Sequence, residues 1–149
     1  MALETILLAV GPGDADRTEE LAQTVSDVAE SAGAHVVLAH VFTDEEFDGV
    51  VSQLDYDPTG EIDPDEVAQR HATVRHLTDA FDGTGVEYSI RGQVGEHGET
   101  IVELANEVGA DRVVVGGRKR SPTGKAVFGS TAQEVMLHAP CPVTFVRGD

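Results

Sequence analysis

A glycine-rich and basic stretch, residues 116–131, holds the residues best suited to chemistry in this 149-residue chain. It contains four of the ten basic residues of the chain: Arg118, Lys119, Arg120 and Lys125. Glycines at 116, 117, 124 and 129 let a backbone approach a ligand and present its N–H groups. Ser130 and Thr131 follow the last glycine as the start of a predicted helix, whose free N–H groups and positive dipole end favour an anion. The stretch therefore predicts a phosphate-binding loop.

Glycine and positive charge in this loop allow two other interpretations. A solvated loop whose bases pair with nearby acids, with Ser130 serving only as an N-cap, has the same composition. A P-loop is excluded, because the glycine required before Gly124-Lys125 is Lys119 and the residue after Lys125 is Ala126. The glycines of residues 92–98 have the wrong spacing for a dinucleotide fingerprint, and we interpret that segment as a turn into a helix.

Apolar runs and helical stripes alternate along the chain. Strands are predicted at residues 6–10, 36–42, 86–90, 112–116 and 142–146. Helices are predicted over 14–31, from Pro64 through Val67, His71, Val74, Leu77 and Phe81, over 99–108, and from Ser130. This order predicts an α/β fold of the Rossmann-like kind, an open five-stranded, mostly parallel sheet with helices on both faces. Residues 43–65 read as a partly ordered acidic connection and not as a linker, so we expect a single domain over residues 1–149.

Ligands of open parallel sheets bind beyond the carboxyl ends of the strands. That places the candidate site in three loops, residues 11–14, 41–43 and 116–130. We interpret Asp14 and Asp16 as N-terminal helix residues that cap the helix or balance its dipole. His40 is interpreted as a packed strand histidine, with a place in the pocket wall as the alternative. The six histidines have no zinc-like spacing, so no metal site is expected.

The net charge of −17 sets limits on partners and surroundings. Such a surface repels nucleic acid and anionic lipid, so neither partner is expected. Acids number 27, and a surface this acidic costs compactness through self-repulsion, which salt relieves. We therefore expect a salt-rich cytoplasm, as in a halophile. The start of the chain lacks a basic, apolar export signal and no run is long enough to cross a bilayer, which also favours the cytoplasm.

The stretch 113–147 resembles the C-terminal half of universal stress proteins. Members that bind ATP carry Gly, two residues, Gly, nine residues, then Gly-Ser or Gly-Thr, and Gly116, Gly129 and Ser130 stand in that register. Residues 109–116 and 135–143 also match, and residues 5–10 are similar to the first strand of the family. The resemblance covers nearly the whole chain except residues 43–65.

The resemblance implies a sheet of strand order 3-2-1-4-5, a homodimer formed through the last strand, and ATP or AMP held between the loops. It implies that Gly116, Gly129, Ser130 and Thr131 cradle phosphate and ribose and that Val41 lies against the adenine. Val10 and Lys119 complete the set of candidate nucleotide-binding residues.

This sequence departs from the family pattern at two places. Lys119 replaces the second loop glycine, and Gly11-Pro12-Gly13 replaces the usual Asp-Gly-Ser after the first strand. The leading hypothesis is a dimeric adenine-nucleotide sensor or adaptor in stress regulation, with slow ATP hydrolysis at most, because no general base is placed in the loop. The departures favour the alternative of a dimeric interaction module that no longer binds nucleotide, and a small nucleotide-using transferase is a third class.

Overall fold

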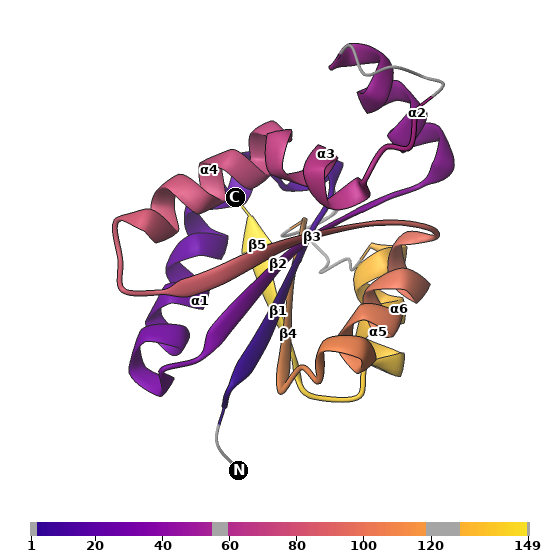
Figure 1. Ribbon diagram of the computed structural model, residues 1–149. Helices are drawn as coiled ribbons and strands as arrows, with labels where there is room; N and C mark the ends of the chain where they lie inside the picture. Colours follow the sequence, from indigo (N-terminus) through magenta and orange to yellow (C-terminus); the bar gives the residue numbers. More distant parts are fainter. Residues whose placement is uncertain (1–2, 55–59, 119–128, 149) are drawn as a thin grey trace.

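A five-stranded parallel sheet forms the centre of the computed structural model, which describes residues 3–54, 60–118 and 129–148 (Figure 1). The strands are β1 (Thr5–Val10), β2 (His35–Phe42), β3 (Glu87–Val94), β4 (Arg112–Arg118) and β5 (Val143–Gly148). They lie in the order β3-β2-β1-β4-β5, and every neighbouring pair is parallel. The predicted fold class and strand order are thus confirmed.

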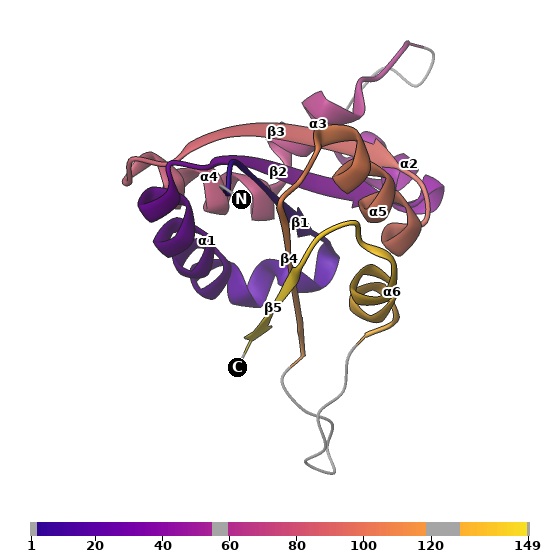
Figure 2. The same cartoon turned by 90° about the horizontal axis from the view of Figure 1, so that it is seen from below.

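Helices cover both faces of this sheet, as the alternating pattern predicted. The 3-10 helix η1 (Pro12–Arg17) leads into α1 (Thr18–Ala32), which lies beside α4 (Ala72–Asp82) on one face. On the other face α5 (His97–Val108) packs against α6 (Ser130–His138), as Figure 2 shows from below. The remaining helices, α2 (Asp44–Gln53) and α3 (Pro64–Arg70), follow β2 at the edge of the molecule.

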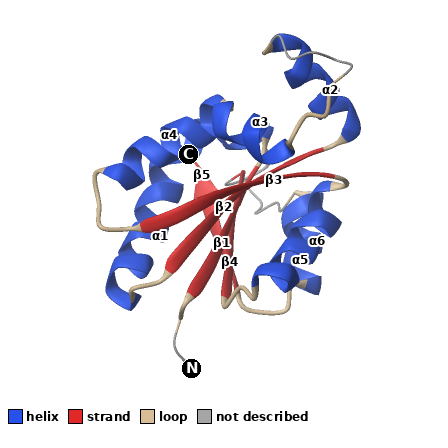
Figure 3. Cartoon of the chain, viewed as in Figure 1, coloured by secondary structure: helices blue, strands red, loops and turns tan. Residues whose placement is uncertain are grey.

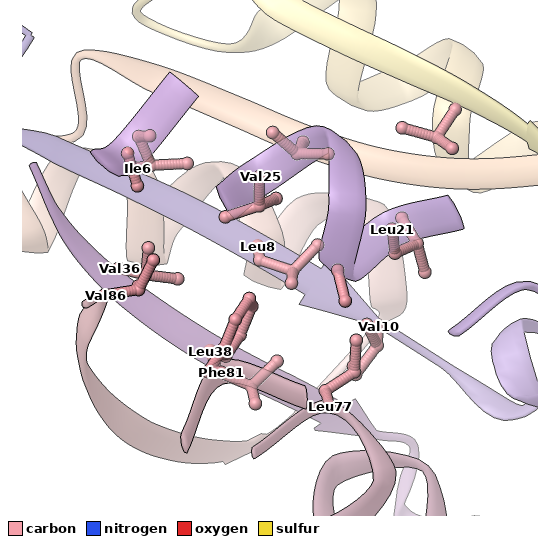
Figure 4. Packing of buried hydrophobic residues seen from close by; sticks show 14 of the residues in the cluster. Ile6, Leu8, Val10, Leu21, Val25, Val36, Leu38, Leu77, Phe81 and Val86 are labelled. Atoms are coloured by element: carbon pink, nitrogen blue, oxygen red, sulfur yellow. The ribbon is translucent and has the colours of Figure 1, made fainter. Parts of the chain in front are cut away.

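Each face of the sheet has its own apolar core because side chains alternate along a strand. Ile6, Leu8 and Val10 of β1 pack with Leu21 and Val25 of α1 and with Leu77 and Phe81 of α4 (Figure 4). Leu7 and Ala9, the intervening residues, face Ile101 and Leu104 of α5 and Val135 of α6. β1 is buried on both sides, which explains its uninterrupted apolar sequence.

The described parts of residues 43–65, which are 43–54 and 60–65, are more regular than the sequence indicated. Thr43 begins α2 with a capping box, in which its Oγ1 accepts from Glu46 N and Glu46 Oε1 accepts from Thr43 N. Figure 3 shows α2 as a helix between β2 and α3. Val51 of α2 joins Phe42, Val67 and Ala68 in a third apolar cluster. This cluster anchors α2 and α3 to the end of β2.

The helix predicted from Pro64 through Phe81 is in fact two helices that meet at His71. His71 has extended backbone angles, and its Nδ1 accepts from Thr73 N at 3.3 Å, which caps α4. The apolar spacing runs through the break although the two helices pack against different elements. α3 lies on β3, where Asp65 Oδ1 accepts from Gly92 N at 2.7 Å, whereas α4 packs against α1.

Two further predictions about element boundaries were wrong. β3 continues to Val94, so residues 92–94 belong to the strand and not to a turn. The helix predicted over 14–31 begins as the separate 3-10 turn η1, and α1 proper starts at Thr18. No helix in the part of the chain that the structure describes is both long and apolar enough to cross a membrane.

Candidate functional site

A cleft of about 480 Å³ opens where the carboxyl ends of β1 and β4 meet the N-terminus of α6. Its walls come from η1, β1, β2, β4, α5 and α6, and the lining residues are Ala9, Val10, Gly11, Gly13, Asp14, Arg17, Val41, His97, Ile101, Val115, Gly116, Gly117, Gly129, Ser130, Thr131 and Ala132. The volume falls within the range of pockets that hold small molecules or cofactors. The cleft lies at the edge of the sheet where ligands of open α/β folds bind.

Six of the seven candidate binding residues line this one cleft, although they come from four separate parts of the chain. They are Val10, Val41, Gly116, Gly129, Ser130 and Thr131. The seventh, Lys119, lies outside the described residues, as do Arg120 and Lys125. The structure therefore brings the predicted residues together, while their contacts with a ligand stay a prediction.

The N-terminus of α6 presents backbone donors to the cleft. Gly129 is the N-cap, and no side chain among the described residues caps this helix. Ser130, Thr131 and Ala132 hold the first positions, whose N–H groups have no partner within the helix. A Cβ at Gly129 would meet no described atom within 4 Å, and its φ is −63°, so neither backbone strain nor packing against the described residues requires this glycine. Within the described residues, it leaves open space beside three N–H groups that have no partner inside the helix.

Asp14 and Arg17 of η1 line the cleft next to Gly116 of β4. Asp14 Oδ2 accepts from Gly11 N at 2.8 Å, and Oδ1 accepts from Arg17 Nη1. Asp14 is only 7% exposed, so the ion pair is largely removed from water. A Cβ at Gly116 would lie 2.7 Å from Arg17 Cδ and 2.8 Å from Asp14 Oδ1. Gly116 is therefore required by this ion pair, whatever it does for a ligand.

The prediction that Asp14 belongs to the start of a helix is confirmed, because it caps η1 through Gly11 N. It also lines the cleft, which the sequence did not indicate. Arg17 and His97 were missed as lining residues as well. The signal available for His97 was its place just after the carboxyl end of β3, the same edge of the sheet as the predicted loops.

His97 connects the cleft with α2. Its Nε2 donates to Glu46 Oε1 at 2.7 Å, so the first residue of α5 is held by a carboxylate from another element. Burial raises the pKa of Glu46, but the hydrogen bond from Thr43 N and the contacts with His97 outweigh burial, and the net pKa is lowered. Glu46 is consequently ionised at neutral pH and accepts both hydrogen bonds.

His40 does not line this cleft, contrary to the alternative considered for it. The side chain is 1% exposed and stacks on Phe42, with ring centroids 4.3 Å apart. It is a packed strand histidine, as the first interpretation held, and it faces a second hollow described below.

The chemistry of the cleft combines an anion site with apolar walls. Free N–H groups of α6 suit a phosphate, and Val10, Val41, Ile101 and Val115 provide apolar surface for a planar ring. Within residues 3–54, 60–118 and 129–148, no group of three or more His, Cys, Asp or Glu side chains is arranged to hold a metal ion.

Fold and cleft together define an open, doubly wound α/β protein with a ligand cleft at the carboxyl ends of its central strands. The model of the universal stress protein family matches residues 2–147. The chain is 30% identical over 144 residues to a universal stress protein of Thermus aquaticus, covering 97% of this chain and 98% of that protein. This chain belongs to the universal stress protein family.

Solved structures show the same fold. A universal stress protein from Archaeoglobus fulgidus superposes with a TM-score of 0.68 at 28% identity, over 97% of this chain and 98% of its own. A universal stress protein of the same organism in complex with dAMP gives 0.64 at 24% identity, over 99% and 100% of the two chains. A family protein from Arabidopsis thaliana with AMP bound gives 0.63 at 16% identity, over 98% and 92%.

Proposed function

We propose that this protein binds an adenine nucleotide, ATP or AMP, in the cleft between β1, β4 and α6. The observation that carries the proposal is the N-terminus of α6, which no described side chain caps, beside the space at Gly129 that the described residues leave open. Such an end binds phosphate through backbone N–H groups and the helix dipole. Ser130 and Thr131 lie at the same point and would bind phosphate and ribose.

The apolar walls of the cleft suit the base. Val41 and Val10 come from neighbouring strands β2 and β1, and both are almost fully buried. Since both side chains have little exposed surface left, an adenine against them would mainly remove the apolar face of its own ring from water, at little cost in protein entropy, because strands are rigid. The dAMP and AMP complexes of relatives support an adenine nucleotide as the ligand. Lys119 would supply charge to the phosphates.

We further propose that residues 1–149 act as one domain, in the cytoplasm, as a homodimeric sensor or adaptor for cell stress. The support for a dimer through β5 is its place at the edge of the sheet, where one side of the strand has no pairing partner among the described strands. Light scattering coupled to gel filtration should give twice the chain mass of 15.8 kDa. A monomer at all concentrations would reject this part of the proposal.

Ser130→Asp tests the cleft directly. The substitution places a carboxylate where the phosphate is proposed to bind, so the affinity for ATP and AMP should fall at least about a hundredfold in calorimetric titration of the nucleotide-free protein. Gln133→Glu is the matched control, because it adds the same charge on the exposed side of α6 and does not line the cleft. Equal affinity of Ser130→Asp and the control would contradict the assignment.

A dimeric interaction module without nucleotide is the second candidate function. The observation that favours it is the saturation of Asp14, whose two carboxylate oxygens are already bonded to Gly11 N and Arg17. This acid is the nearest counterpart of the aspartate that other family members carry after the first strand. Leu137 is 71% exposed on α6 and would suit a protein partner. Dimers that bind neither ATP nor AMP at millimolar concentration would favour this function.

A further inference from the structure

His97, the first residue of α5, joins the wall of the nucleotide cleft to α2. Its side chain is 28% exposed and lines the cleft, whereas Glu46, its hydrogen-bond partner, lines a second hollow instead. That hollow, of about 450 Å³, lies at the end of β2 beside His40, Gly49 and His71. Glu46 therefore holds His97 without lining the cleft itself.

The carboxylate of Glu46 fixes which ring nitrogen of His97 carries the proton. Ionised Glu46 can only accept, and its Oε1 lies 2.7 Å from His97 Nε2, so Nε2 is the N–H donor. In a neutral imidazole the other nitrogen, Nδ1, is then a bare acceptor. Glu46 is itself held in place, because the same oxygen accepts from Thr43 N in the capping box of α2.

The free nitrogen of His97 is open to a ligand. Nδ1 has no hydrogen-bond partner within the described residues, and, unlike the ring nitrogens of His40, it is not shut off from solvent. The two nitrogens of an imidazole point widely apart, so a ring that directs Nε2 at α2 directs Nδ1 away from it. A molecule in the cleft can therefore reach this lone pair.

His97 lies at the end of the cleft where the base of a nucleotide would lie. The turn before it is tied to the end of β2, since Gly95 N donates to Phe42 O at 2.8 Å. The proposed phosphate site at the N-terminus of α6 adjoins the end of β4, which lies two strands away from β2 in the sheet. Neighbouring strands are about 4.8 Å apart, so the two ends of the cleft are on the order of 10 Å apart. This separation suits the length of a nucleoside monophosphate from phosphate to base.

An acceptor at this place distinguishes 6-aminopurines from 6-oxopurines. Adenine carries an amino group, which donates, on the part of the ring far from the ribose. Hypoxanthine and guanine carry an oxygen there, and its lone pairs would face the lone pair of Nδ1. Val41 and Ile101, whose apolar side chains also line the cleft, cannot make this distinction. A site that hydrogen-bonds one substituent rejects an analogue that cannot pair far more strongly than an apolar pocket does.

We propose that Glu46 and His97 set the base specificity of the cleft. His97 Nδ1 accepts from the 6-amino group of adenine, and Glu46 is the positioning residue that keeps Nδ1 unprotonated. The inference rests on the proposed nucleotide binding and deepens it, because it names the side chain that selects adenine over hypoxanthine and guanine.

AMP and IMP are the probes, because they share ribose and phosphate and differ at position 6 of the purine, which carries an amino group or an oxygen. In calorimetric titration of the nucleotide-free protein at pH 8, where an ordinary imidazole is neutral, AMP should bind at least about tenfold more tightly than IMP. His97→Phe removes the acceptor and keeps a ring, so the preference for AMP should fall to within about twofold. His138→Phe is the matched control at an exposed position of α6 outside the cleft, and it should keep the preference of the parent.

Glu46→Gln tests the positioning role. Glutamine preserves the capping box with Thr43, but its amide can donate or accept, so both tautomers of His97 become possible. The ¹⁵N shifts of the His97 ring should show a protonated Nε2 and a bare Nδ1 in the parent without nucleotide, and a mixture of the two tautomers in Glu46→Gln. The preference for AMP should fall about threefold or more with it. Glu45→Gln, exposed in the same turn of α2 and outside the cleft, is the control and should change neither.

Folding of each variant is checked by its own amide spectrum and melting curve, so a loss of binding is not confused with unfolding. Three results would overturn this inference alone: equal affinity of the parent for AMP and IMP, a preference for AMP that survives in His97→Phe, or a protonated Nδ1 in the parent at pH 8. No binding of either nucleotide would instead remove the proposed function, and the inference with it, so the two failures are distinguishable.

Discussion

His97 Nε2 lies 2.7 Å from Glu46 Oε1, and this hydrogen bond joins the cleft at β1 and β4 to the hollow beside His40. His97 lines the cleft at the carboxyl ends of β1 and β4, and Glu46 lines the hollow beside His40. The two residues are 51 positions apart in the sequence.

Gly116→Ala should destabilise the fold. The added Cβ would lie 2.7 Å from Arg17 Cδ and 2.8 Å from Asp14 Oδ1, so β4 or the ion pair must move. We expect a loss of about 1–3 kcal/mol in the free energy of unfolding, measured by urea denaturation. An unchanged midpoint would mean that the ion pair adjusts without cost.

Gly129→Ala should leave the stability of the fold unchanged and weaken nucleotide binding. Its Cβ would enter open space and its φ is ordinary, so the free energy of unfolding should stay within about 0.5 kcal/mol of the parent. Nucleotide affinity should fall about tenfold or more, because the methyl group occupies the space beside the α6 N–H groups. Retained affinity in Gly129→Ala would show that the phosphate binds elsewhere.

Removal of the Asp14 carboxylate should leave Arg17 buried and unpaired. Asp14→Ala loses the hydrogen bond from Gly11 N as well, and we expect a cost of about 3 kcal/mol or more. Arg17→Met keeps the apolar stem and should cost less. The double variant should be more stable than the sum of the two single losses predicts, and strict additivity in urea denaturation would show that the two residues do not act as a pair.

Acid should destabilise the protein through His40. The unfolded chain takes up a proton near pH 6.5, whereas folded His40 does so only near pH 3, because burial disfavours its charge. Stability is therefore fully present above about pH 6.5 and falls as the pH drops from 6.5 toward 3; at about 1.4 kcal/mol per pKa unit the full effect is several kcal/mol.

His40→Phe should flatten this pH dependence, since a phenyl ring can keep the stack on Phe42 without taking up a proton. His76→Gln, on the exposed side of α4, is the control and should keep the slope of the parent. Melting temperatures between pH 7 and pH 4.5 provide the comparison. A slope in His40→Phe equal to that of the control would assign the acid sensitivity to other groups.

Salt should raise the melting temperature steadily. With 27 acids against 10 bases, the folded chain gathers like charges that the Debye length of about 3 Å at 1 M salt screens from one another. Equimolar KCl and NaCl series should give similar curves if screening is the cause. A melting temperature that stays flat or falls between 0.1 M and 3 M KCl would contradict the expectation of a salt-rich cytoplasm.

The sheet and the main cleft followed from local patterns in the sequence. Ile6–Val10 and Val36–Phe42 are buried on both faces, so each appears in the sequence as a continuous apolar run, whereas the half-exposed edge strand β3 appears as a short alternating segment. The position of the cleft followed from where parallel strands end. The break at His71 could not be predicted from the sequence. Val67 and Val74 keep helical spacing across it although they pack against different elements. The place of the Asp14–Arg17 ion pair beside Gly116 and the hollow at Gly49 depend on contacts between distant segments of the chain. Local hydrophobic periodicity does not predict such contacts.

The nucleotide content of the purified protein tests the central claim most directly. The protein is isolated in molar KCl, denatured, and its released small molecules are identified by chromatography and mass spectrometry; the stripped protein is then titrated with ATP, ADP and AMP. We expect a near-stoichiometric adenine nucleotide, or micromolar binding of ATP or AMP that is lost in Ser130→Asp. No released nucleotide, together with no binding at millimolar concentration, would contradict it.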